Sequence, residues 1–223
     1  NGIFRSTNFG DSFVNIGNGM QTLQFYNGFS NSATDSVLAI GQVQDHIPGY
    51  IYRGATPWER GVVDEVGWTA IDQTNDNIMY ADDRNGSTMY KSTDRGVSFN
   101  GVAGFGGAGA WNAPFVLSPS NTNVLYFGST LIYKSINAAG SFALTNGGAV
   151  LDGNPALSMA VSSIHPDTVF VGMAPFTTIA HIFRTTNGGT SWANVTGTLP
   201  NRYPLDIAIN PKNTKTVYTT FGG

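Results

Sequence analysis

The sequence predicts an all-β fold made of repeated antiparallel strands, and three observations support this. A nine-residue segment at 91–99 recurs at 5–13, 134–142 and 184–192. The copies that begin at Lys91, Lys134 and Arg184 are 43 and 50 residues apart, a period typical of repeat architectures. The 28 glycines, 12% aromatic and 11% charged residues suit short strands joined by turns. No long window shows the apolar periodicity of an amphipathic helix.

The repeated segment is interpreted as a hairpin turn. Each copy follows apolar residues and contains Ser or Thr, then Asp or Asn, then Gly or Ala, then Ser and an aromatic residue. Asp and Asn side chains bond to the backbone of tight turns, and Gly accepts positive φ. We therefore expect the polar and glycine positions to be structural rather than functional: Asn8, Gly10, Asp94, Gly96, Asn137, Asn187 and Gly189. The 86 residues from Arg5 to Lys91 predict one decayed copy between them, at 52–58.

A second repeated element lies out of phase with the first. It reads as a strand, a turn rich in Pro and Asn, and another strand, at 71–80, 117–126, 164–170 and 209–218, with a weaker copy at 29–40. Together the two elements define a unit of four strands. The first strand is expected at 156–161 and 205–209, and the second at 124–127 and 169–172. Four antiparallel strands repeating about every 45 residues are the blade of a β-propeller.

The ends of the chain fall inside the repeat. Residues 2–5 match the third strand of a blade, and 217–221 match the second. Residues 1–223 are therefore predicted to be a single propeller domain or a propeller segment with about five blades' worth of strands. Either the two ends complete one shared blade in a five-bladed ring, or the chain is part of a larger propeller. The start at Asn1, without a methionine, indicates a processed form or a fragment.

The repeated turn resembles the Asp-box, Ser/Thr-x-Asp-x-Gly-x-Thr-Trp, of bacterial neuraminidase repeats and sortilin-like propellers. Residues 185–192 fit it except at Asn187 and Ser191, and the third copy departs further with Asn137 and Ala139. Residues 41–45 and 197–203 also look like stretches of large secreted bacterial Asp-box proteins. The resemblance covers nearly the whole chain. It implies a secreted or cell-surface location and favours a segment of a longer, seven-bladed or larger propeller over a complete ring.

Composition narrows the functional classes. The net charge of −3 gives no basic field for a nucleic-acid partner, and no apolar run approaches the length of a membrane span. The absence of cysteine removes disulfides and thiolate sites. The three histidines are scattered along the chain. We therefore expect no metal and no cofactor.

A site on a propeller is expected where the connections between blades, and between second and third strands, emerge on one face, here called the loop face. A glycosidase of the xyloglucanase type needs two carboxylates about 5–10 Å apart, and the candidates are Asp45, Asp64 and Glu65. Asp residues also cap turns, which is the alternative for all three. The candidate binding residues are Trp58, Arg60, Trp111 and Tyr203, and Trp58 and Trp111 are the candidate stacking platforms for a sugar.

Sialidase activity is disfavoured, because it needs three convergent arginines and Arg5, Arg53 and Arg184 occupy the repeated position before the turn. The preferred hypothesis is a non-catalytic binding or scaffolding propeller. Its partner would be a glycan, a protein or the remaining blades of a parent protein. The alternatives are a polysaccharide hydrolase of the xyloglucanase or sialidase-like type and a purely structural module. The Asp-box does not decide between them, because sialidases, xyloglucanases, receptors and photosystem assembly factors all carry it.

Overall fold

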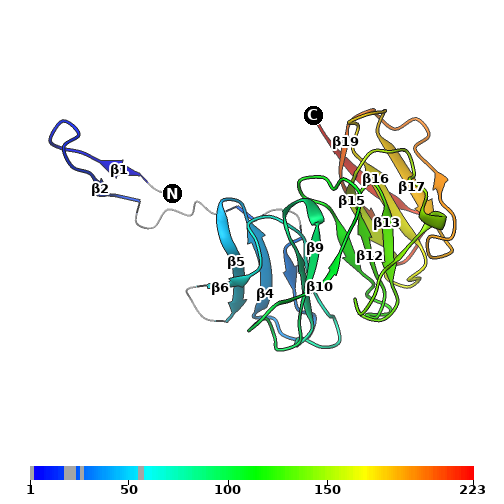
Figure 1. Cartoon of the computed structure of the whole chain (residues 1–223), viewed down its shortest axis with the longest axis horizontal. Coiled ribbons are helices and arrows are strands. Elements are labelled where there is room, and N and C mark those ends of the chain that lie inside the picture. The colour runs from blue at the N-terminus through cyan, green and yellow to red at the C-terminus, as the bar shows by residue number, and fades with distance from the viewer. Residues whose placement is uncertain (1–2, 18–23, 26–27, 55–57) are drawn as a thin grey trace.

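The fold is nearly all-β. A computed structural model describes residues 3–17, 24–25, 28–54 and 58–223. Within these residues the strands form four antiparallel sheets of four strands, each a simple meander, and two separate two-stranded hairpins. Two short 3₁₀ turns, η1 (Arg84–Gly86) and η2 (Asn146–Gly148), interrupt the connections. The sheets follow one another around an arc (Figure 1). The predicted β-propeller architecture is confirmed.

The four complete sheets are called blades 1 to 4. Blade 1 contains β3 (Ser30–Asn31), β4 (Leu38–Val43), β5 (His46–Arg53) and β6 (Glu59–Val62). Blade 2 contains β7 (Thr69–Ile71), β8 (Met79–Asp82), β9 (Thr88–Ser92) and β10 (Asn100–Gly104). Blade 3 contains β11 (Phe115–Leu117), β12 (Leu125–Gly128), β13 (Ile132–Ser135) and β14 (Ala143–Leu144). Blade 4 contains β15 (Ala156–Val161), β16 (Val169–Met173), β17 (His181–Thr185) and β18 (Ala193–Asn194).

Each end of the chain forms half a blade. The first hairpin consists of β1 (Phe4–Arg5) and β2 (Val14–Asn15), which correspond to the third and fourth strands of a blade. The last hairpin consists of β19 (Tyr203–Ile209) and β20 (Val217–Gly222), which correspond to the first and second strands. The two hairpins belong to different sheets, and β1–β2 projects away from the blades (Figure 1). The shared blade considered from the sequence is thus not assembled in this conformation.

The core lies between blades rather than within one sheet. In β8, Met79 and Ala81 pack with blade 1, whereas Tyr80 packs with Phe115 and Phe127 of blade 3. This follows from the alternation of side chains along a strand. Because both faces of a blade are covered, the second strand of each complete blade is buried throughout.

The repeated turns share one hydrogen-bond pattern. In the second copy, the Ser92 hydroxyl donates to Asp94 Oδ1 at 2.7 Å, the Gly96 N–H to Ser92 Oγ at 2.8 Å and the Ser98 N–H to Asp94 Oδ1 at 2.9 Å. The other three copies repeat these bonds with Asn in place of Asp. Of the decayed copy expected at 52–58, residues 55–57 lie outside the described part of the chain.

Candidate functional site at the loop-face end of the central channel

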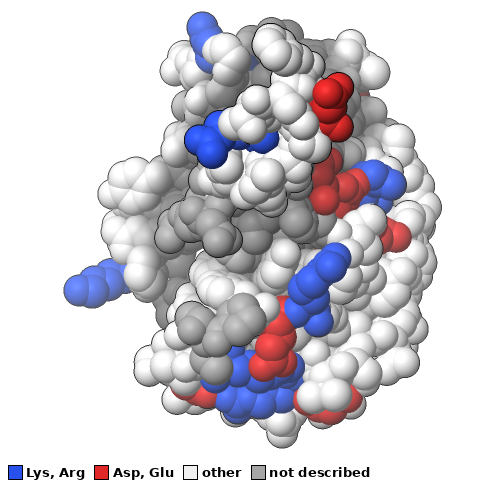
Figure 2. All heavy atoms as spheres, turned by 90° about the vertical axis from the view of Figure 1, so that its left-hand side faces the viewer, with Lys and Arg blue, Asp and Glu red and all other residues white. Residues whose placement is uncertain are grey.

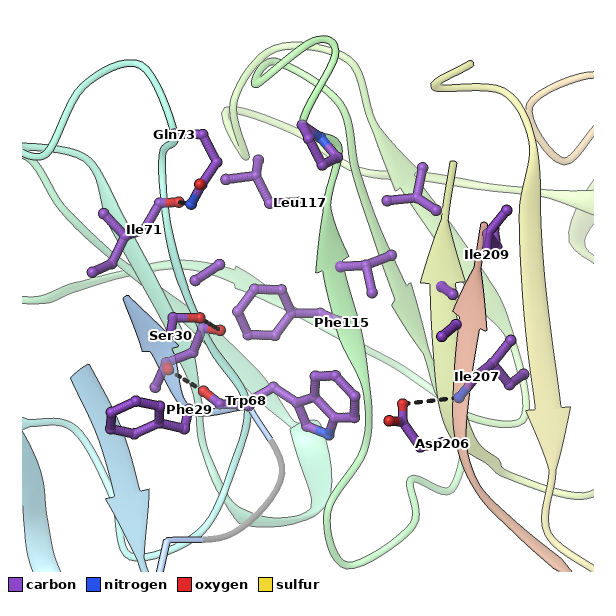
Figure 3. A pocket seen from close by; sticks show the side chains of 18 residues that line it. Phe29, Ser30, Trp68, Ile71, Gln73, Phe115, Leu117, Asp206, Ile207 and Ile209 are labelled. Atoms are coloured by element: carbon purple, nitrogen blue, oxygen red, sulfur yellow. Dashed lines mark hydrogen bonds between the residues drawn. The ribbon is translucent and has the colours of Figure 1, made fainter. Parts of the chain in front are cut away.

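The first strands of successive blades line a central channel. Residues of β3, β7, β11, β15 and β19 enclose a cavity of about 600 Å³. Figure 3 shows these strands with their side chains turned into the space between them. The first and last of these strands therefore face the same cavity. This cavity lies on the axis of the propeller, and residues of all four complete blades and of β19 line it.

The two ends of the channel differ in character. Gln73, Leu117 and Ile209 lie at one end and Trp68 and Asp206 at the other (Figure 3). Trp68 immediately precedes β7, so its end of the channel opens toward the loop face. The Asp206 carboxylate is exposed there, and its Oδ1 accepts the N–H of Ile207 at 2.8 Å. The loop-face end thus combines an indole ring with an accessible carboxylate.

Trp68 is held from two sides. Its backbone N–H donates to Asp82 Oδ1 at 2.5 Å, and the N–H of the next residue, Thr69, donates to the Gly28 carbonyl at 3.0 Å. Its indole Nε1 is buried and has no hydrogen-bond partner among the described residues. Buried donors are nearly always paired, so the unpaired nitrogen lowers the stability of the fold locally. The ring lines the channel in this position.

A buried polar network supports Trp68 from behind. Asp82 is fully buried, and Gln42, only 1% exposed, donates from Nε2 to the Asp82 carbonyl at 2.7 Å. Burial raises the pKa of the Asp82 carboxyl well above its ordinary value; the Trp68 N–H opposes this shift, and Asp83 and Asp64 add to it. Asp82 Oδ2 has no hydrogen-bond partner among the described residues. Asp82 is therefore a buried structural carboxyl whose surroundings favour the protonated form, and it does not reach solvent.

The predicted carboxylates Asp64 and Glu65 lie together in the connection from β6 to β7. Asp64 accepts the N–H of Glu65 at 2.7 Å and that of Arg84 at 3.2 Å. Glu65 is 9% exposed and pairs with the Arg84 guanidinium. Asp45 is exposed in the short turn between β4 and β5, with a φ of 62°. Asp64 and Glu65 are thus engaged in loop contacts, and none of the three is among the described residues that line the channel.

The predicted binding residues are dispersed. Trp58 packs on Phe25 and Tyr52, with ring centroids 5.2 and 5.1 Å apart, on the face of blade 1 that points away from blade 2. Arg60 donates to the carbonyl of Ile47.

Trp111 and Tyr203 lie at or before the starts of first strands. Trp111 is 42% exposed in the connection before β11. Tyr203 is 40% exposed at the start of β19 and lies 6.1 Å from the ring of Phe176. Both belong to the loop face, beside the channel rather than in it.

Sequence reasoning did not select Trp68 or Asp206 as site residues. Both lie at the loop-face end of first strands. Two sequence features could have indicated them. Trp68 is an aromatic residue immediately before a first strand, and Asp206 is an acidic residue within a first strand, where apolar residues are expected.

The face drawn in Figure 2 is sparsely charged, and basic and acidic side chains lie interspersed on it. Across the described residues, no group of three His, Asp or Glu side chains is placed to hold a metal ion. Nor does any described helix have the length and apolar character needed to cross a membrane.

The chain is similar in sequence to one xyloglucanase and in fold to several known structures. No family model matches it. A xyloglucanase of Hypocrea jecorina (strain QM6a) is 29% identical over 153 residues, which are 68% of this chain and 15% of the relative. The GH74 enzyme of Niastella koreensis superposes with a TM-score of 0.63 at 20% identity, over 90% of this chain and 35% of that structure.

Two further structures show how widely the fold is shared. An ancestral GH74 enzyme superposes with a TM-score of 0.53 at 16% identity, over 87% of this chain and 35% of its own. A chain of the COPII outer coat vertex on membranes gives 0.60 at 14% identity, over 89% of this chain and 58% of its own. These superpositions establish the propeller fold. The chain spans well under half the length of the xyloglucanase and of both GH74 structures.

Proposed function

We propose that this chain is the propeller portion of a glycoside hydrolase related to xyloglucanases, and that it binds a xyloglucan-like polysaccharide at the loop-face end of its channel. The observation that carries the proposal is the 29% identity to a xyloglucanase over 153 residues. We assign the repeated turns as Asp-boxes on their shared hydrogen bonds, and with them an exported or cell-surface location. The identity to a xyloglucanase, rather than the Asp-boxes, gives the hydrolase alternative more weight than a generic scaffold.

The geometry of the channel end supports sugar binding. The Trp68 ring lines the channel and offers an apolar face on which a sugar ring can stack. The exposed Asp206 carboxylate accepts hydrogen bonds from sugar hydroxyls. Trp111, 42% exposed on the same face, extends the apolar surface for a longer chain.

Hydrolysis requires a second carboxylate. Glycosidases use two, one as acid and one as base or nucleophile. Among the described channel-lining residues Asp206 is the sole carboxylate, and Asp64 and Glu65 are held in loop contacts. We therefore infer that this chain by itself binds the polysaccharide and that complete catalysis uses a carboxylate from elsewhere in a longer protein.

The test is calorimetric titration of the chain with xyloglucan oligosaccharides, with mannan oligosaccharides as the comparison ligand. We expect Trp68→Phe to retain binding, and Asp206→Asn and Trp111→Ala to weaken it about tenfold, which corresponds to about 1.4 kcal/mol. Ile164→Ala, at an exposed position in the turn between β15 and β16, is the matched control and should bind unchanged. Equal affinity for both sugars, or none for xyloglucan at millimolar concentration, would refute the proposal.

A protein partner is the second candidate, because apolar side chains also gather on the loop face of blade 4. Phe176 and Ile179 are 59% and 56% exposed in the connection from β16 to β17, and Phe176 touches the half-exposed Tyr203. Exposed aromatic clusters mark many protein interfaces. A double variant, Phe176→Ser with Ile179→Ser, separates the two candidates, because it should abolish protein binding and leave sugar binding intact.

A further inference from the structure

We propose that Asn146 is a site of spontaneous covalent modification in the folded chain, at which the side-chain amide is lost as ammonia and water takes its place, giving aspartate and isoaspartate. The inference does not depend on the proposed function. It rests on a comparison of the four Asn-Gly pairs of which the structure describes both residues, at 85–86, 100–101, 146–147 and 187–188.

The reaction takes place between an asparagine side chain and the backbone nitrogen of the next residue. That nitrogen loses its proton and bonds to the Cγ carbon, and the bond from Cγ to the side-chain nitrogen breaks, so that ammonia leaves. Water then opens the five-membered imide at either carbonyl. One opening gives aspartate, and the other gives isoaspartate, whose main chain runs through the side-chain carbonyl. Glycine after the asparagine favours the attack, because it has no Cβ to obstruct it and adopts unusual backbone angles readily.

The repeated turn of blade 4 holds both reacting groups of Asn187. Its Oδ1 accepts hydrogen bonds from the Thr185 hydroxyl at 2.9 Å and from the Ser191 N–H at 3.1 Å, and its Nδ2 donates to Ser191 Oγ at 2.9 Å. The N–H of Gly188 donates to the Asp167 carbonyl at 3.0 Å. The attack would break these bonds, so the fold protects this pair.

The backbone protects the pairs that begin at Asn85 and Asn100. The N–H of Gly86 donates to the Asp83 carbonyl at 2.9 Å, and Gly86 is buried. Asn100 begins β10, and both residues of its pair lie in the ladder with β9. A paired strand holds extended backbone angles, and the asparagine has to rotate away from them to close the imide ring.

The reacting groups of Asn146 are the least restrained of the four pairs. Its Nδ2 donates one hydrogen bond, to the Ala149 carbonyl at 3.2 Å, and its Oδ1 accepts none from the described residues. The N–H of Gly147 has no acceptor among those residues. Gly147 is exposed, and nothing lies within 4 Å of the position that a Cβ would take there. Solvent therefore reaches the attacking nitrogen, and few contacts oppose its approach to Cγ.

A groove beside η2 gives the Asn146 side chain room to turn. The groove has a volume of about 520 Å³ between the outer strands of blade 3 and the repeated turn of blade 4, and Asn146, Gly147 and Gly188 are among the residues that line it. The pair lies in a turn, with φ of 52° at Asn146 and 62° at Gly147. No strand ladder therefore has to open before the imide forms.

The isoaspartate product is expected to loosen the contact between blades 3 and 4. The N–H of Asn146 donates to the Gly189 carbonyl in the repeated turn of blade 4 at 2.7 Å. Isoaspartate adds one carbon to the main chain at this residue, which displaces the rest of η2 from that turn. The aspartate product keeps the original main chain and therefore keeps this hydrogen bond.

The test is peptide mapping by mass spectrometry after incubation of the folded chain in mildly alkaline buffer. The mass of each peptide shows whether its amide has become an acid. We expect Asn146 to convert at least about tenfold faster than Asn85, Asn100 or Asn187, a difference of about 1.4 kcal/mol in activation free energy. The chain unfolded in concentrated urea is the control. All four pairs contain the same two reacting residues, so their rates should converge there.

Two glycine variants form a matched pair. Gly147 and Gly153 both have positive φ, 62° and 85°, and neither has an atom within 4 Å of the Cβ position, so alanine should be accommodated equally at both. Gly147→Ala places a Cβ beside the attacking nitrogen and should slow conversion of Asn146 at least about tenfold. Gly153→Ala should leave the rate at Asn146 unchanged.

Thermal unfolding tests the consequence for the blades. The isoaspartate form, separated by chromatography from the aged chain, should melt at a lower temperature than the variant Asn146→Asp, which carries the same charge on an unaltered main chain. Four results would overturn the proposal. They are a rate at Asn146 no higher than at another of the four pairs, the same order of rates in urea, no slowing in Gly147→Ala, and equal melting of the isoaspartate form and Asn146→Asp.

Discussion

The backbone N–H of Trp68 donates to Oδ1 of Asp82 across 2.5 Å, and this bond joins the channel to the buried end of β8. Trp68 stands immediately before the first strand of blade 2, and Asp82 ends the second. The carboxyl therefore positions the residue that carries the candidate binding ring. The contribution of this junction to stability can be measured by substituting Asp82 and the neighbouring Gly67.

Replacing Asp82 by Asn should remove a pH dependence of stability. Burial raises the pKa of Asp82 in the folded chain above its ordinary value of 3.8, so the folded state holds a proton that the unfolded state releases. The free energy of unfolding should therefore fall as pH rises above about 3.8. Asp82→Asn keeps an oxygen for the Trp68 N–H and carries no such proton. We expect a melting temperature at pH 7 equal to or above that of the parent, with the difference vanishing near pH 3.8.

The control for this measurement is Asp11→Asn, an exposed position in the first repeated turn, which should leave the pH profile unchanged. A loss of more than about 2 kcal/mol in Asp82→Asn at pH 7 would instead show that an ionised Asp82 stabilises the fold, as breaking a paired buried charge does.

Substituting Gly67 by Ala should destabilise the same junction. Gly67 has a φ of +152°, and a Cβ there would lie 2.5 Å from the Asp82 carbonyl oxygen and 2.8 Å from Gln42 Nε2. Strain and overpacking together should lower the free energy of unfolding by about 2–4 kcal/mol. Gly153→Ala is the matched control, because φ is +85° and nothing lies within 4 Å, and it should cost about 1 kcal/mol. Urea titration measures both, and equal losses would contradict the steric argument.

Much of the fold could be predicted from the repeats. The first strand expected at 156–161 is β15 (Ala156–Val161), and the second strand expected at 169–172 is β16 (Val169–Met173). The residues that form turns and the alternation of apolar and polar side chains along strands are local patterns, so they can be recognised directly in the sequence. The sequence left open whether β1–β2 pairs with β19–β20, because pairing of distant strands depends on chain closure rather than on local pattern.

The candidate site was less predictable. Asp64 and Glu65 were selected for their residue type and loop position, but their contacts with Arg84 depend on a loop nineteen or twenty residues away. Trp68 and Asp206 were not selected, because which side of a first strand faces the channel is decided by the packing of the blades. A sequence shows that a carboxylate is present in a loop, but not whether a neighbouring loop has already engaged it.

Removing the Tyr126 hydroxyl should weaken the contact between blades 3 and 4. The hydroxyl donates to the Pro166 carbonyl of the next blade at 3.0 Å, and Tyr80 makes the equivalent bond to Ala138 at 3.3 Å. Tyr126→Phe should lower the free energy of unfolding by about 1 kcal/mol, and Tyr80→Phe by less because its bond is longer. Chemical denaturation of the two variants tests the order, and a larger loss at Tyr80 would contradict it.

Exchanging Asp and Asn between repeated turns should transfer a pH dependence from one turn to another. The hydroxyl and N–H of Ser98 and the hydroxyl of Ser92 donate to the Asp94 carboxylate, and these bonds lower its pKa to about 2. A carboxylate with a lowered pKa stabilises the fold above about pH 3.8, and that stabilisation is lost as pH falls toward 2. In Asp94→Asn the amide can donate to Ser98 as Asn187 does to Ser191 at 2.9 Å, so we expect an intact turn at pH 7 and a flatter acid limb in thermal unfolding between pH 4 and 2. The reverse change, Asn187→Asp, should steepen that limb, and an unchanged profile in both variants would show that these turns do not contribute to acid unfolding.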